Sequence, residues 1–120
     1  MASGMVKVII KRPGDQYGTV EWIPKTRDAV MTILDLDEHE ILGVEPYQEH
    51  VIGGDLLVVA AEKIVHKSCF MPEGWLFRQD EGTIIVCSIK CGRIVDLQID
   101  YGEWKDRVDG YGEWKDRVDS

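Results

Sequence analysis

The sequence has 120 residues, of which 44% are hydrophobic and 30% are charged, and its formal net charge is −8. This length is typical of one domain, and the hydrophobic content argues against a chain that is disordered throughout. The negative charge disfavours nucleic acid as a partner because it repels phosphate. No apolar run reaches the roughly 18 residues that a membrane-spanning helix needs.

The first third of the chain predicts a β-hairpin followed by a helix. Residues 5–11 are short and β-branched, residues 13–15 supply turn chemistry, and residues 17–23 alternate enough to form the partner strand. Thr26 is a candidate helix N-cap because its hydroxyl can accept a hydrogen bond from an amide of the first turn. Apolar residues at helical spacing follow, and we expect this helix to end near Leu36.

The middle of the chain is less regular. Residues 40–47 predict a third strand. Residues 55–61 are almost continuously apolar, which is typical of a central strand covered on both faces. Residues 64–80 contain proline, glycine and mixed polarity, so we expect a long loop there with one short strand near residues 75–77.

A second hairpin signal follows. Residues 82–89 predict a strong strand, Cys91 and Gly92 a tight turn, and residues 93–99 the returning strand. The expected fold class is therefore α+β, with a mixed or mainly antiparallel sheet of five to six strands and one helix packed on a face. We expect residues 5–99 to form this single domain.

Residues 100–120 contain a tandem repeat, because the nine residues of Tyr101–Asp109 recur unchanged as Tyr111–Asp119. Their aromatic and valine residues align on one side of a helix, but glycines weaken it, so we expect a partly helical or disordered tail. A tryptophan repeated among charges indicates a protein-binding element. Its candidate residues are Tyr101, Trp104, Tyr111 and Trp114. Alternatively, the first copy alone packs on the sheet.

Three motifs of the domain follow one another in order: Val6–Gly14, the segment Gly-Gly-Asp-Leu-Leu-Val-Val at 53–59, and Gly82–Val86. In this order the chain resembles a family of small uncharacterised domains carried by phages and conjugative elements of gut bacteria. The resemblance covers about residues 5–99 and implies an accessory protein of a mobile element. It transfers no catalytic residue, and the chain departs from the pattern in residues 64–80.

The candidate metal ligands are His66, Cys69, Cys87 and Cys91, since three thiolates and an imidazole would complete a tetrahedral zinc site. The last two residues are four apart, which is roughly 13 Å on an extended strand, so they share an ion only if the hairpin turn curls. The alternative is two core cysteines and one turn cysteine. No other cofactor is expected.

No phosphate-binding loop or nucleophile motif occurs, so we expect a protein that is not an enzyme. The first hypothesis is an accessory protein of a phage or mobile element that binds a host or element macromolecule, for example to interfere with defence. The second is an oligomer that binds a small ligand in a groove lined by Trp75, Phe77 and Arg78, although these aromatic residues also suit a core. The third is a zinc-stabilised interaction module. Three cysteines without an apolar leader lead us to expect a cytoplasmic location.

Overall fold

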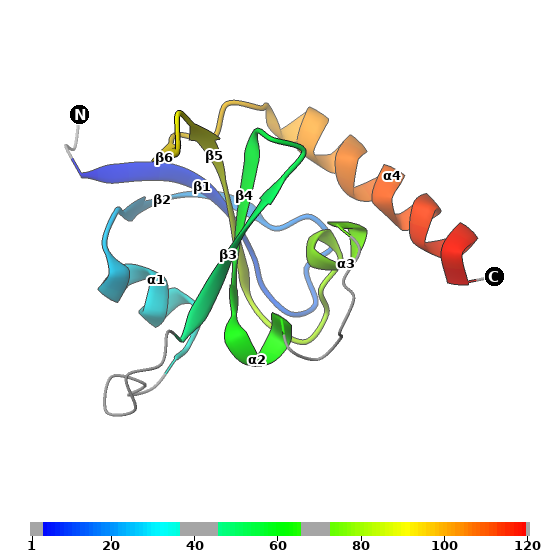
Figure 1. Cartoon of the computed structure of the whole chain (residues 1–120), viewed down its shortest axis with the longest axis horizontal. Coiled ribbons are helices and arrows are strands. Elements are labelled where there is room, and N and C mark those ends of the chain that lie inside the picture. The colour runs from blue at the N-terminus through cyan, green and yellow to red at the C-terminus, as the bar shows by residue number, and fades with distance from the viewer. Residues whose placement is uncertain (1–3, 37–45, 66–72, 120) are drawn as a thin grey trace.

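The computed structural model describes residues 4–36, 46–65 and 73–119, with side chains described as far as Gly110. Its centre is an antiparallel sheet in the order β2-β1-β5-β4-β3, with β6 also paired to β5 (Figure 1). The strands are β1 (Met5–Lys11), β2 (Thr19–Pro24), β3 (Tyr47–Ile52), β4 (Leu56–Ala61), β5 (Ile84–Lys90) and β6 (Arg93–Val95). The helices are α1 (Arg27–Ile33), α2 (Glu62–Val65), α3 (Glu73–Phe77) and α4 (Tyr101–Asp119). The predicted α+β class is confirmed.

Tight turns between neighbouring strands set the register of the sheet. Gly53 and Gly54 connect β3 to β4 with φ angles of +66° and +84°, a conformation that side chains bearing a Cβ rarely adopt. All six residues of β4 are buried, and β4 pairs with β3 on one side and β5 on the other. The prediction of a central strand at residues 55–61 is therefore confirmed.

Helix α1 begins where the sequence predicts. The backbone N–H of Ala29 donates to the hydroxyl oxygen of Thr26 at 3.2 Å, so Thr26 is the N-cap. The helix ends at the C-cap residue Leu34, and Asp35 follows with a φ of +55°. The result is a helix of only seven residues, none of which is fully buried.

Three expected elements differ from the structure. Residues 75–77 belong to helix α3 and not to a short strand, because Leu76 and Phe77 pack into the core from a helical turn. The third strand lies at Tyr47–Ile52, so only its first residue overlaps the expected 40–47, of which residues 40–45 lie outside the described part. The strand after the second hairpin turn is limited to Arg93–Val95.

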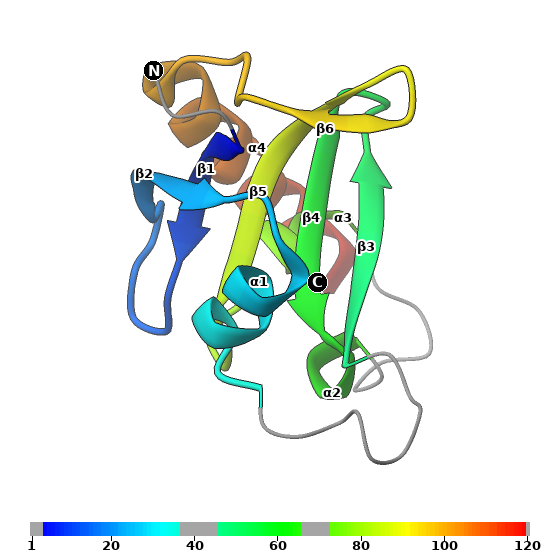
Figure 2. The same cartoon turned by 90° about the vertical axis from the view of Figure 1, so that its left-hand side faces the viewer.

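The sheet has helices on both faces, whereas one helix on one face was expected. Figure 2 shows α1 in front of the sheet and α4 behind it. We call these two surfaces the α1 face and the α4 face. The core on the α4 face includes Ile9, Val58, Val86, Phe77 and Trp104. The core on the α1 face includes Val8, Ile10, Leu57, Val59, Ile85 and Cys87. Side chains alternate between the two along each strand, as the pleat requires.

The first copy of the repeat belongs to the core. Trp104 and Val108 are 0% exposed, and the Trp104 ring lies 5.0 Å from that of Phe77, centroid to centroid. The indole N–H of Trp104 donates to the backbone oxygen of Tyr17 at 2.6 Å. A boundary at residue 99 therefore does not separate the domain from a tail, since part of the core lies beyond it.

Candidate functional site

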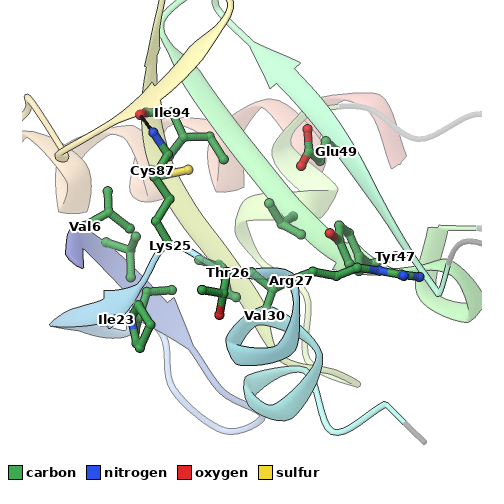
Figure 3. A pocket seen from close by; sticks show the side chains of 14 residues that line it. Val6, Ile23, Lys25, Thr26, Arg27, Val30, Tyr47, Glu49, Cys87 and Ile94 are labelled. Carbon is green, nitrogen blue, oxygen red and sulfur yellow. Dashed lines mark hydrogen bonds between the residues drawn. The ribbon is translucent and has the colours of Figure 1, made fainter. Parts of the chain in front are cut away.

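A pocket of about 260 Å³ opens on the α1 face (Figure 3). It exists because α1 is too short to cover the sheet between its own position and β6. The lining residues come from all six strands, from the β2–α1 junction and from α1 itself. They are Val6, Val8, Ile23, Pro24, Lys25, Thr26, Arg27, Val30, Tyr47, Glu49, Val59, Ile85, Cys87 and Ile94. We call this cavity the α1 pocket.

The floor of the α1 pocket is apolar. Val8, Val59 and Ile85 are 1–3% exposed, and Val59 and Ile85 are directly paired across β4 and β5. The thiol of Cys87 lies in the same floor and is 1% exposed. Burial, with a smaller effect of the Glu49 charge, raises the pKa of this thiol to about 12. Cys87 therefore stays protonated near neutral pH and contributes an uncharged surface, not a nucleophile.

The rim of the α1 pocket is charged. The ammonium of Lys25 donates to the backbone oxygen of Ile94 at 2.7 Å, which ties the β2–α1 junction to β6. In Figure 3 the side chain of Arg27 extends along another side toward Tyr47, and Glu49 lies beyond the floor on β3. Lys25, Arg27 and Glu49 are all exposed, so the mouth carries two positive charges and one negative charge.

The structure does not assemble the expected metal site from the described residues. Cys87 points into the floor of the α1 pocket, whereas Cys91 is exposed in the β5–β6 turn, and both thiols are free. His66 and Cys69 lie outside the described residues. Within the part of the chain that is described, no cluster of three histidine, cysteine or carboxylate side chains is placed to hold an ion.

The described members of the other two predicted sets lie on the α4 face, away from the α1 pocket. Phe77 is 0% exposed, Trp75 packs half-buried against the same core, and Arg78 is exposed beside them. Trp104 is buried in that core and offers no free aromatic surface, whereas Tyr101 packs against the core and is half-buried. The side chains of the remaining candidates, Tyr111 and Trp114, are outside the described part.

A buried lysine lies outside the α1 pocket. Lys11 is 1% exposed, and its ammonium donates to the backbone oxygen of Gln79 at 2.6 Å. Burial lowers the pKa of Lys11, while the charges of Asp80 and Asp15 oppose this effect. The contact fastens the segment after α3 to the end of β1, and we interpret Lys11 as a structural residue.

Sequence reasoning missed the α1 pocket. Thr26 was identified only as a helix cap, although Lys25 and Arg27 on either side of it supply the positive charges of the rim. The signal in the sequence that could have indicated this pocket was the short length of the helix, because a helix of about two turns is too small to cover a sheet face.

Comparison of the chain with protein families, characterised proteins and solved structures finds no match. No helix among the described residues is long and apolar enough to span a membrane.

Proposed function

We propose that this protein is a non-catalytic binding protein that holds a small molecule with an apolar body and one anionic group in the α1 pocket. The observation that supports this most is the combination of an apolar floor with a mouth that carries two cationic side chains and one carboxylate, and therefore a net positive charge. Apolar pockets with a few convergent polar groups are the usual form of small-molecule sites. The neutral thiol of Cys87 and the backbone-bonded ammonium of Lys25 are poorly prepared for nucleophilic chemistry.

The size of the α1 pocket limits the ligand. A cavity of roughly 150 Å³ accommodates a benzene ring, and drug-sized ligands occupy about 300–1,000 Å³. At about 260 Å³ the pocket suits one substituted ring or a short branched chain. A carboxylate on such a molecule would accept charge-assisted hydrogen bonds from Arg27 or Lys25 at the mouth. The net charge of −8 opposes an anion at long range, so the contacts at the mouth have to supply the selectivity.

Ligand-dependent melting tests this proposal. Phenylacetate and 3-phenylpropionate should raise the Tm in a concentration-dependent way, and their uncharged amides should raise it less. Val30→Phe fills the α1 pocket and should abolish the rise. Ile33→Phe is the matched control, because Ile33 is half-buried on the same helix but does not line the pocket. An equal response of both variants, or no response of the unaltered protein to any probe, would contradict the proposal.

A second pair of variants tests whether the positive charge at the mouth of the α1 pocket selects the anionic group of the ligand. Arg27→Gln should reduce the preference for the carboxylates over their amides. Arg78→Gln should leave that preference unchanged, since Arg78 is exposed on the opposite face of the sheet. If instead Arg78→Gln removed the preference and Arg27→Gln did not, the ligand would lie near Trp75 and Phe77 on the α4 face.

A macromolecular partner is the second candidate, and the edge of the sheet favours it. Strand β3 ends the strand order, and Val51 on it is 55% exposed. An extended segment of another protein could add to this edge by main-chain hydrogen bonds.

The proposed accessory role in a phage or mobile element rests on the family resemblance of residues 5–99. The free thiols of Cys87 and Cys91 agree with a reducing compartment such as the cytoplasm.

Charged substitutions separate the two candidates. Val51→Lys should prevent strand addition at β3 and leave the response to phenylacetate unchanged. Val20→Lys is the matched control, because Val20 is 39% exposed on β2 at the other end of the strand order. A partner captured from bacterial lysate should be lost with Val51→Lys alone. Retention by both variants would count against recognition at β3.

A further inference from the structure

The surface of the α4 face that holds Tyr101–Asp109 makes directed contacts as well as apolar ones. We call this surface the repeat site; it is formed by Tyr17, Gly18, Asp55 and Phe77. The hydroxyl of Tyr101 donates to the backbone oxygen of Gly18, and the indole of Trp104 donates to that of Tyr17. The guanidinium of Arg107 contacts the carboxylate of Asp55 at 3.1 Å, and the Tyr17 hydroxyl donates to Asp109 at 2.9 Å. The site therefore contacts four polar side-chain groups of the repeat at defined positions.

Every one of these groups recurs in the second copy, at the same spacing. The counterparts of the four contacting residues are Tyr111, Trp114, Arg117 and Asp119. In Figure 1 the second half of α4 extends away from the sheet. The chain thus carries two identical ligands for one repeat site, and the structure places the first of them in it.

We propose that Tyr111–Asp119 exchanges with Tyr101–Asp109 in the repeat site of the same molecule, so that the chain populates two registers ten residues apart. In the second register residues 100–110 form the connection from Ile99 to the docked helix. The contacts to the site are the same in both registers because the two sequences are identical. The connection grows from one residue to eleven, and each doubling of a flexible loop lowers its population about threefold, so the second register should be the minor one by a factor of roughly 35.

The same molecule is the favoured donor of the second copy. A tethered segment has an effective concentration in the millimolar range, well above that of a second chain in dilute solution. Exchange between two molecules would also require the first copy of the second molecule to leave its own repeat site, and exchange within one molecule does not. A dimer that exchanges copies is therefore the competing outcome, and the experiment below distinguishes it.

The residue that precedes each copy makes the two registers unequal. Asp100 accepts a hydrogen bond from the backbone N–H of Glu103 at 2.7 Å and so caps the helix. The equivalent position before the second copy is Gly110, which has no side chain to act as a cap. The first register should therefore predominate. The pair of changes Asp100→Gly and Gly110→Asp should move the population toward the second.

Crosslinking tests the exchange in the full chain with its native cysteines replaced by alanine. Asp55→Cys with Arg107→Cys reports the first register, and Asp55→Cys with Arg117→Cys reports the second, using a short bis-maleimide. In the first register position 117 lies about 15 Å further along the helix axis than position 107. We expect an intramolecular crosslink for both pairs, and the yield of the second should rise several-fold on adding Asp100→Gly and Gly110→Asp.

Two further outcomes would overturn the proposal. The control pair is Asp55→Cys with Asp116→Cys. Position 116 corresponds to Asp106 of the first copy, which is exposed, so a docked second copy would hold this thiol away from position 55. Equal yields for positions 116 and 117 would indicate undirected motion of the chain and not docking. A link for position 117 that appears only in dimers would assign the second copy to the repeat site of another molecule.

Melting provides an independent measurement. If the second copy replaces the first, Trp104→Ala should lower the Tm clearly less than Trp104→Ala with Trp114→Ala, and Trp114→Ala alone should have little effect. For the double variant we expect a loss of about 10 °C or more, as for truncation of a buried tryptophan in a domain of this size. An equal loss for Trp104→Ala and the double variant would contradict the exchange.

Discussion

Individual backbone angles identify one residue that is a poor choice for its position. Cys91 and Gly92 form the turn between β5 and β6 with φ angles of +54° and +73°. Turns with two positive φ angles favour Asn-Gly, and a left-handed residue with a Cβ costs roughly 1 kcal/mol. Cys91→Asn and Cys91→Gly should each raise the free energy of unfolding by about 0.5–1 kcal/mol in urea titrations. Gly92→Ala should lower it, and a loss with both Cys91 variants would contradict this description of the turn.

The second prediction at this scale concerns the thiol under the α1 pocket. Burial raises the pKa of Cys87 from an ordinary 9.0 to about 12. Between these values the unfolded chain loses the thiol proton and the folded chain keeps it. Stability therefore falls as the pH rises from about 9, with a slope of at most about 1.4 kcal/mol per pH unit. Melting should show a shallower alkaline decline for Cys87→Ala, whereas Cys91→Ala, at an exposed position, should behave like the unaltered protein.

Among the elements, helix α4 contains a residue that weakens it. Gly102 is exposed in the first turn, and an added Cβ would meet only Asp100 Oδ1, at 3.4 Å. Gly102→Ala should therefore raise the free energy of unfolding by up to about 1 kcal/mol, the helix-propensity difference between the two residues. Gly82→Ala is the contrasting variant, because its Cβ would overlap the side chain of Ile64 and should destabilise the protein. Equal denaturation midpoints for the two variants would contradict this prediction.

The helix with a cap and the apolar run of seven residues could be predicted, and the three-residue apolar segment at 75–77 could not. The buried strand at 55–61 and the Thr26 cap each depend on local chemistry that acts within a few residues. Residues 75–77 have no such signal, because a short apolar run suits a strand or a buried helical turn equally well. The third strand was placed too early in the chain, since pairing with β4 through the Gly53–Gly54 turn fixes its register.

For the whole molecule, the arrangement of helices over the two faces depends on packing that a single sequence does not reveal. The sequence predicts an apolar stripe in Tyr101–Asp109, but its glycines favour a tail and leave packing on the sheet as the alternative. Tertiary packing outweighs that penalty, because Trp104 and Val108 are completely buried against the α4 face. The α1 pocket was missed for the opposite reason: it is defined by the area that α1 leaves uncovered, not by any motif.

A pair of truncations tests whether α4 is part of the domain. A buried aromatic side chain removes about 150–250 Å² from water, which is worth about 4–6 kcal/mol at 25 cal/mol per Å². Small domains are stable by only about 5–15 kcal/mol, so a chain ending at Ile99, which lacks Trp104 together with Val108 and Tyr101, should lose cooperative unfolding. We expect it to keep far-ultraviolet circular dichroism and to bind a hydrophobic dye, as a molten globule does. A chain ending at Gly110 keeps Trp104 and Val108 and should unfold cooperatively, and cooperative unfolding of both chains at the same temperature would show that the core does not need α4.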